Sequence, residues 1–187
     1  MEKTKKIIGE IEIPEGITLE VKGNLVSAKG PKGETSLTTN EKAAEVKVDG
    51  NKIIVTSKNI GKKYKKQVNT IIANIKNIIL GVNEGFAYKL KVCSGHFPMN
   101  VSIGNGELVV KNYFGEKIPR NLKLKPGVEV KLEGDIINVT GTNKNLCGQV
   151  AADIEKLASR RSFDRRIFQD GIYIIEKAGK KIQWKNY

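Results

Sequence analysis

The sequence repeats itself at a constant spacing of 84 residues, and this repeat constrains the fold more than any other feature. Residues 44–57 read AEVKVDGNKIIVTS, and residues 128–141 read VEVKLEGDIINVTG. Chance does not keep one register over so many positions, so we expect two tandem copies of one folding unit. The identical pairs in this register are Glu45/Glu129, Val46/Val130, Lys47/Lys131, Gly50/Gly134, Ile53/Ile137, Val55/Val139 and Thr56/Thr140.

The similarity continues on both sides of this segment. Gly33-Glu34 and Gly115-Glu116 form matching turns before it, and a helical stretch with a Gln-Val pair follows it in each copy. In a chain of 187 residues, copies of this size can each enclose a small core. We therefore expect residues 1–83 to form a first α+β repeat, and residues 84–187 to form a second α+β repeat with a basic C-terminal tail.

The spacing of apolar residues predicts the elements of each copy. Alternation of apolar and polar residues predicts antiparallel strands, and steps of three and four residues then predict one helix per copy. The helices begin near residues 60 and 143, and Gly81 is the expected C-cap of the first. The expected fold class is α+β: two tandem duplicated domains, each an antiparallel β-sheet packed against one α-helix, with the strands first and the helix last. The expected strands are 7–13, 17–21, 25–28, 34–38, 46–48 and 53–55 in the first copy, and 86–92, 99–103, 107–111, 128–132 and 136–140 in the second.

The charge of the chain points to a polyanionic partner. Lysine and arginine number 33 against 20 acidic residues, which gives a net charge of +13 and an isoelectric point near 9.7. Such a field favours nucleic acid or an anionic membrane surface. Both halves share the excess, with +6 in residues 1–83 and +7 in residues 84–187, and residues 157–187 hold eight basic and three acidic side chains.

The remaining composition is typical of a soluble intracellular protein. Two cysteines are too few for a disulfide framework, so a reduced, cytosolic environment is expected. No apolar run reaches the ~18 residues that a membrane span needs, and the N-terminal residues have no signal-peptide core.

Candidate catalytic and metal sites are weak. Cys93 and His96 form a C-x-x-H pair, but a zinc site needs three or four ligands, and the only other cysteine or histidine is Cys147. A Cys–His nucleophile pair has no activating or orienting group near it in the sequence. The Gly-rich segments 30–33 and 104–106 lie between strands rather than before a helix, so they are turns and not phosphate-binding loops. We expect no metal, no cofactor, no small-molecule substrate and no catalytic residue.

Basic clusters are better candidates for function. Lys62–Lys66 lie on the polar face of the first helix, where a solvated surface and a partner contact are about equally plausible. The C-terminal cluster combines arginine pairs with aromatic residues, so its guanidinium groups could bind phosphate while its rings stack on bases or anchor the tail. Segment 113–120, YFGEKIPR, is a further candidate for contact with RNA, through Lys117 and Arg120. Phe114 in this segment is expected to be packed rather than stacked on RNA.

Several of these segments resemble the large-subunit ribosomal protein L6 family, in its archaeal and eukaryotic branch. The resemblance covers nearly the whole chain, and tandem duplication is a feature of that family. Residues 166–174 with Lys177 (R-x-F-x-D-G-I-Y-I) are the most specific match. The others are 21–23 (VKG), 29–33 (KGPKG), 96–101 (HFPMNV), 112–117 (NYFGEK) and 125–128 (KPGV).

This resemblance implies a function. Members of the family are structural constituents of the large ribosomal subunit that bind large-subunit rRNA near the sarcin–ricin loop and the base of the lateral stalk, where translation factors bind. The implied partners are this rRNA and neighbouring ribosomal proteins including the stalk base, with no membrane, and the implied location is the cytoplasmic ribosome. The second domain and its tail would carry the RNA contacts, through Lys117, Arg120, Arg160, Arg161, Arg165, Arg166, Lys177, Lys180 and Lys181. For the last two residues the assignment rests on charge alone.

Three alternatives remain open from the residues themselves. A free RNA-binding or chaperone-like protein would act on many RNAs without preference. An enzyme centred on Cys93 and His96 would lose its activity when either residue is replaced by alanine. A protein of the membrane surface is less well supported, because the basic helix face is short and the apolar face is needed for the core.

Overall fold

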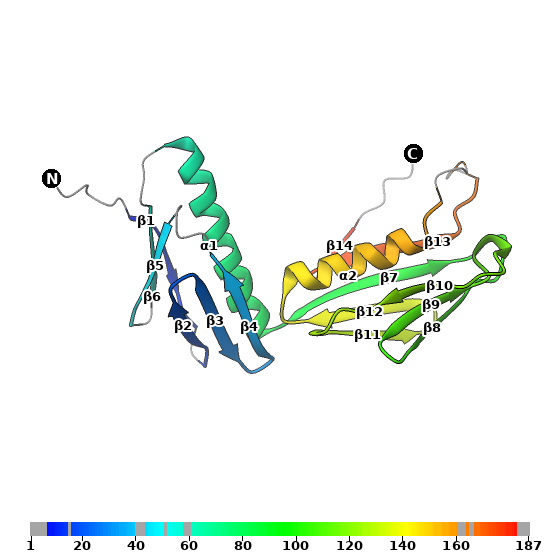
Figure 1. Cartoon of the computed structure of the whole chain (residues 1–187), viewed down its shortest axis with the longest axis horizontal. Helices are drawn as coiled ribbons and strands as arrows, with labels where there is room; N and C mark the ends of the chain where they lie inside the picture. Colours follow the sequence, from blue (N-terminus) through cyan, green and yellow to red (C-terminus); the bar gives the residue numbers. More distant parts are fainter. Residues whose placement is uncertain are drawn as a thin grey trace. The chain divides into compact units, whose positions relative to one another are not determined.

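The computed structural model describes residues 7–14, 16–39, 44–50, 52–57, 61–160, 164 and 167–182. The chain divides into two compact units, Met1–Gly85 (unit 1) and Phe86–Tyr187 (unit 2). Each unit contains antiparallel sheets and one helix of at least three turns (Figure 1). The α+β fold class predicted from the sequence is confirmed.

Unit 1 has two three-stranded antiparallel sheets and one long helix, α1. The core forms where α1 packs on the sheet β1-β6-β5, because Ile53 and Val55 of β6 and Val68 and Ile75 of α1 are fully buried. The second sheet, β2-β3-β4, packs against the C-terminal half of α1 through Ala28, Ile78 and Val82. The strands are β1 (Ile7–Glu12), β2 (Thr18–Lys22), β3 (Leu25–Gly30), β4 (Gly33–Thr38), β5 (Ala44–Asp49) and β6 (Lys52–Ser57).

Helix α1 runs from Lys62 to Asn83, two residues further than expected. The prediction of Gly81 as its C-cap is wrong, because Gly81 is buried inside the helix and its carbonyl oxygen accepts a hydrogen bond from the N–H of Gly85 at 3.0 Å. Gly85 is the residue that leaves the helix, in a left-handed conformation with φ of 79° that glycine adopts without strain.

Unit 2 repeats this plan and extends it. Its sheet β11-β12-β7 matches β5-β6-β1, and Ile137 and Val139 of β12 are fully buried like their counterparts Ile53 and Val55. Its second sheet, β8-β9-β10, matches β2-β3-β4 and contributes Leu108 to the same core. The elements are β7 (Phe86–Cys93), β8 (Asn100–Gly104), β9 (Glu107–Lys111), a 3-10 turn (Tyr113–Gly115), β10 (Arg120–Lys123), β11 (Val128–Glu133), β12 (Ile136–Gly141), α2 (Lys144–Leu157), β13 (Gly171–Lys177) and β14 (Lys180–Lys181).

Helix α2 begins as expected, with Asn143 as its N-cap. The side-chain oxygen of Asn143 accepts hydrogen bonds from the N–H groups of Asn145 and Leu146 at 3.0 and 3.2 Å. These bonds satisfy two of the N–H groups that the first turn of a helix leaves unpaired. Val150 and Ile154, four residues apart on one face of α2, are buried in the core of unit 2.

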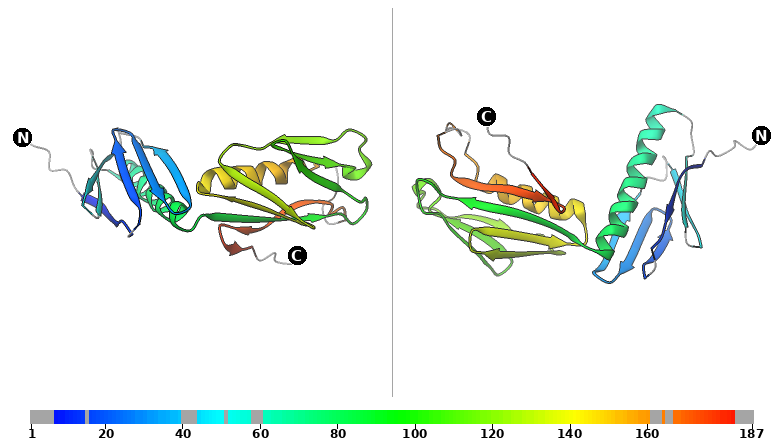
Figure 2. Two further views of the ribbon diagram at one scale, coloured as in Figure 1. Left: turned by 90° about the horizontal axis from the view of Figure 1, so that it is seen from below. Right: turned by 180° about the vertical axis from the view of Figure 1, so that it is seen from behind.

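The expectation that each unit ends in its helix is wrong for unit 2. After α2 the chain returns as β13, which pairs with the free edge of β7 and widens the sheet to five strands in the order β11-β12-β7-β13-β14 (Figure 2). Ile172 and Ile174 of β13 are buried beside Val92 and Leu90. In unit 1, none of the described strands occupies the corresponding edge of β1. Strand β10 was also not predicted.

No helix in the described part of the chain combines the length and the apolar character that a membrane crossing requires.

Candidate nucleic-acid interface

Three loops of unit 2 meet beyond the end of β7, and we call residues 94–99, 112–119 and 167–170 the tip. The side-chain amide of Asn112 donates a hydrogen bond to the carbonyl oxygen of Pro98 at 2.9 Å, which joins the first two loops. The ring of Phe168 joins the third, because its centroid lies 5.0 Å from that of His96 and 6.1 Å from that of Phe114. Phe114 is therefore packed, as predicted.

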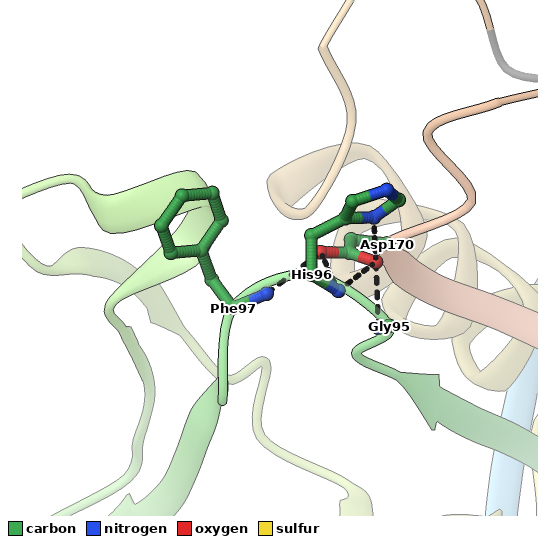
Figure 3. A network of polar contacts seen from close by, with 4 residues as sticks. All are labelled: Gly95, His96, Phe97 and Asp170. Atoms are coloured by element: carbon green, nitrogen blue, oxygen red, sulfur yellow. Dashed lines mark hydrogen bonds and ion pairs between the residues drawn. The ribbon is translucent and has the colours of Figure 1, made fainter.

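Asp170 fastens the first loop of the tip to the start of β13 (Figure 3). Its carboxylate is only 5% exposed and accepts hydrogen bonds from the consecutive N–H groups of Gly95, His96 and Phe97, with the shortest at 2.6 Å. The Nδ1 atom of the His96 ring lies 3.2 Å from the same carboxylate. One buried side chain thus supplies the polar partner for a whole loop, which would otherwise have unpaired backbone groups.

The environment of Asp170 holds it in the ionised form. Burial alone would raise the pKa of this carboxyl group, but hydrogen bonds from Gly95, the His96 ring, and the His96 and Phe97 N–H groups together lower the pKa below its ordinary value. An ionised carboxylate only accepts hydrogen bonds, so each of its four neighbours must be a donor.

Arg120 fastens the second loop of the tip to the end of α2. Its Nε and Nη2 atoms donate to the two carboxylate oxygens of Glu116, each at 2.7 Å, and Nη1 donates to the carbonyl oxygen of Leu157 at 2.6 Å. The guanidinium group also lies 4.4 Å from the centre of the buried Tyr113 ring. Hydrogen bonding to Glu116 raises the pKa of Arg120, and hydrogen bonding from Arg120 lowers the pKa of Glu116. The donor groups of the planar Arg120 guanidinium therefore bind partners inside the protein.

The outer surface of the tip combines a basic side chain with apolar ones. Ile118 is 81% exposed and Phe97 is 45% exposed, and the exposed Lys117 forms no ion pair with any described residue. Ile167, next to Phe168, is also exposed. Single exposed apolar residues are common. A group of them on loops that are held in place by contacts inside the protein can contact sugars and bases.

The other lysines predicted to bind RNA lie at the opposite end of β13. Gly171 pairs with Cys93 at the tip, whereas Lys177 pairs with Tyr88 near the start of β7, so about 20 Å of strand separates them. Lys177 and Lys180 are direct cross-strand partners, joined by a tight turn in which Ala178 and Gly179 both have positive φ values. Like charges opposite each other destabilise a hairpin unless a counter-charge is bound.

The structure therefore divides the predicted site residues into two groups. Lys117, Arg120 and Arg160 belong to the tip or lie beside it, and Arg160 has its Nη1 atom 3.9 Å from Glu116. Lys177, Lys180 and Lys181 form the second group, at the turn between β13 and β14. Arg161, Arg165 and Arg166 lie outside the described residues, so the structure assigns them no position.

Several described lysines pair with acidic side chains, whereas Lys91, Lys111 and Lys123 of the sheets are exposed and, like the candidates, form no ion pair with described residues. Lys131 pairs with Glu129 at 2.8 Å, and Lys47 pairs with Glu45 at the equivalent place in unit 1 at 3.5 Å. Further pairs of this kind are Lys22–Glu20, Lys29–Glu34, Lys52–Glu10, Lys89–Glu176 and Lys125–Asp153. By contrast, Lys117, Lys177, Lys180, Lys181 and the four lysines at 62, 63, 65 and 66 are exposed and form no ion pair with described residues.

The contact between Asp170 and His96 was not predicted from the sequence. No orienting group lies near His96 in the sequence, but the folded chain brings Asp170 to it from a segment 74 residues away. The pairing of β13 with β7 brings the two together, and no local pattern in the sequence predicts that pairing.

The structure offers no competing metal centre among the residues it describes, since no three histidine, cysteine or acidic side chains are grouped there. Cys93 is half-buried and Cys147 is buried, and burial raises the pKa of the Cys147 thiol. A thiol held in this way is protonated and unreactive at neutral pH.

Comparison with known proteins agrees with the duplicated architecture. The family described as Ribosomal protein L6 matches residues 13–85 and 97–171, one segment in each unit. Large ribosomal subunit protein uL6 of Methanosarcina mazei is 41% identical over 174 residues, which cover 93% of this chain and 99% of the relative. The proteins of the same name from Methanococcus vannielii and Methanothrix thermoacetophila are 42% and 38% identical, over 91% and 92% of this chain and 94% and 98% of their own lengths. The chain therefore belongs to the ribosomal protein L6 family.

Proposed function

We propose that this protein is a structural constituent of the large ribosomal subunit and binds large-subunit rRNA. The observation that carries this proposal is its membership of the ribosomal protein L6 family, through one matched segment in each repeat. The three relatives are each named large ribosomal subunit protein uL6, and they match almost end to end. Because members of this family are structural ribosomal proteins, the chain is not an enzyme. Its location would be the ribosome in the cytoplasm.

We further propose that the binding site lies near the sarcin–ricin loop and the base of the lateral stalk, beside the region where translation factors bind. This finer assignment rests on the family resemblance of segments 96–101, 112–117 and 166–174, which overlap the tip. Neighbouring ribosomal proteins, including those of the stalk base, would be the protein partners. Residues 1–83 and 84–187 would act as two domains, and the division into compact units at Gly85 supports that boundary.

The physical mechanism would be passive bracing of RNA. Exposed lysines neutralise phosphates and release counterions, so binding should weaken steeply as salt rises. A-form RNA offers its phosphates, its 2′-hydroxyl groups and its shallow minor groove rather than the base edges of its deep groove. The tip suits such a surface because Asp170 and Arg120 fix its loops from inside while Lys117 and Phe97 face outward.

The two groups of candidates would have different roles. Lys117, Lys177, Lys180 and Lys181, with Arg160, Arg161, Arg165 and Arg166 of the connecting segment, would contact phosphates. Arg120 would act as a positioning residue, because its fork is already bonded to Glu116 and the end of α2. RNA held at both ends of β13 would span about 20 Å of the protein.

Sedimentation tests the proposed function directly. We expect the protein in a native cell lysate to sediment with the large ribosomal subunit on a sucrose gradient in moderate salt, and to dissociate only in high salt. Recovery solely in the light, soluble fractions would overturn the ribosomal assignment. A free RNA-binding or chaperone-like protein would instead bind unrelated structured RNAs as tightly as large-subunit rRNA, which a filter-binding competition would reveal.

Charge reversal tests the arginine segment. Replacing Arg165 and Arg166 together by glutamate is expected to weaken rRNA binding at least tenfold, because the change removes two cations and introduces two repelling anions. The measurement is the Kd for large-subunit rRNA at several salt concentrations, and the salt slope should fall for the variant. A matched control replaces Lys22 and Lys52, which are paired on the sheets of unit 1, by glutamate. Unchanged affinity, with an intact circular dichroism spectrum, would remove these arginines from the site.

A further inference from the structure

The ring of His96 at the tip is held in place by two neighbours and is still accessible to a ligand. Its ring is held on two sides, by Asp170 at 3.2 Å from Nδ1 and by the ring of Phe168 at 5.0 Å between centroids. The side chain is nevertheless 40% exposed. Such a ring has one polar edge turned into the protein and leaves its other nitrogen for a ligand (Figure 3).

The contact with Asp170 determines which ring nitrogen carries the proton. Because Asp170 is ionised and already accepts three N–H groups of the loop, Nδ1 must be a donor to it. In the neutral ring, Nε2 then has a free lone pair and acts as a hydrogen-bond acceptor. Nε2 has no hydrogen-bond partner among the described residues, so this acceptor is available.

An acceptor of this kind selects a donor on the ligand. Phosphate oxygens offer no hydrogen to a neutral imidazole, whereas the ribose 2′-hydroxyl group does. In A-form RNA these hydroxyls line the wide, shallow minor groove, which loops can reach. The half-exposed Phe97 beside His96 could lie against the same sugars.

We propose that Nε2 of His96 accepts a hydrogen bond from a ribose 2′-hydroxyl group of bound RNA, and that Asp170 orients the ring for this contact. The inference rests on the proposed function, since it names a contact within the rRNA interface. It makes His96 a specificity-determining residue, which distinguishes RNA from DNA at one nucleotide, and Asp170 a positioning residue.

Interference mapping with the full chain tests the proposal. Transcripts of large-subunit rRNA that carry 2′-deoxy substitutions at random positions are separated into bound and unbound fractions, and each position is scored. With the unmodified protein, one or a few positions should lose about two- to tenfold in binding, the size of one uncharged hydrogen bond. His96→Phe keeps a ring packed against Phe168 but removes both nitrogens, so one of these interferences should disappear while the others remain.

Three further variants sharpen the test. Ser94→Ala changes an exposed residue of the same loop that has no side-chain contact with Asp170, and its interference pattern should equal that of the unmodified protein. Asp170→Asn should weaken the His96-dependent interference more than any other, because the ring loses its fixed orientation. His96→Ala serves as a second removal of Nε2 if the phenylalanine variant does not fold.

The outcomes separate the inference from the function on which it rests. Identical 2′-deoxy patterns for the unmodified protein and His96→Phe would overturn the inference and leave rRNA binding intact. Loss of a phosphorothioate interference without loss of any 2′-deoxy interference would also overturn it, since His96 would then contact a phosphate. If the unmodified protein does not bind large-subunit rRNA at all, the proposed function fails and the inference fails with it.

Discussion

Replacement of Arg120 by alanine is expected to lower the free energy of unfolding of unit 2 by about 2–3 kcal/mol. The change removes the two bonds to Glu116 and the bond to the Leu157 carbonyl oxygen, and it leaves Glu116 with the more distant guanidinium group of Arg160, at 3.9 Å, as its described counter-charge. An ion pair that is buried destabilises the fold strongly when one partner is removed, because the other charge stays buried. Here the side chains of Arg120 and Glu116 are 25% and 30% exposed, which reduces the expected loss of stability.

Urea unfolding of the full chain, followed by circular dichroism, would measure this effect. Arg120→Lys should recover little of the lost stability, because an ammonium group cannot reach both Glu116 oxygens and the Leu157 carbonyl group at once. Lys123→Ala provides the matched control on the same strand, since Lys123 is exposed, and it should change stability by less than about 0.5 kcal/mol. Equal stability of Arg120→Ala and Lys123→Ala would contradict the role of Arg120 as an internal clamp.

Asp170→Asn should give the second large effect, a loss of about 1–3 kcal/mol near neutral pH that fades in acid. The pKa of Asp170 in the folded protein lies below the ordinary value of 3.8, so ionised Asp170 favours the folded state at any pH above that value. As pH falls below 3.8 and through the lower folded-state pKa, the carboxylate is protonated and its contribution is lost. Asparagine has no such titration, so the two proteins should converge in stability at low pH.

The measurement is the free energy of unfolding of both proteins at several pH values between about 2 and 7. The difference should be constant from neutral pH down to about pH 5 and should then decrease. A difference that stays the same down to pH 2 would show that the asparagine acts through shape alone, and that the charge of Asp170 is not what stabilises the loop.

The sequence was sufficient for those parts of the fold that depend on local pattern. The alternation at 53–55 and 136–140 predicted strands in both copies, and Ile53, Val55, Ile137 and Val139 on these strands are fully buried. The steps of three and four residues predicted both helices, and Val68, Ile75, Val150 and Ile154 on those helices are buried. Local periodicity determines these features because each depends only on neighbours within a few residues.

The parts that the sequence did not reveal depend on contacts between distant segments. Strand β13 reads GIYIIEK, an apolar run without alternation, so its sequence did not show that it would pair with β7. Without that pairing, Asp170 could not be assigned to His96. The family resemblance implied an RNA contact for Arg120, but the sequence did not show that its guanidinium group bonds to the carbonyl groups at the end of α2 and to the carboxylate of Glu116.

The position of β13 also has a consequence for how the protein is made. In unit 1, every described strand and the helix lie before residue 84, so the nascent chain can complete that unit early. Strand β7 of unit 2 must instead wait, with one edge unpaired, until residues 171–177 emerge to pair with it. Pairing over so long a stretch raises the contact order and slows folding, and an open strand edge can meanwhile pair with other chains. The second half of the molecule should therefore be the half that depends on chaperones during translation.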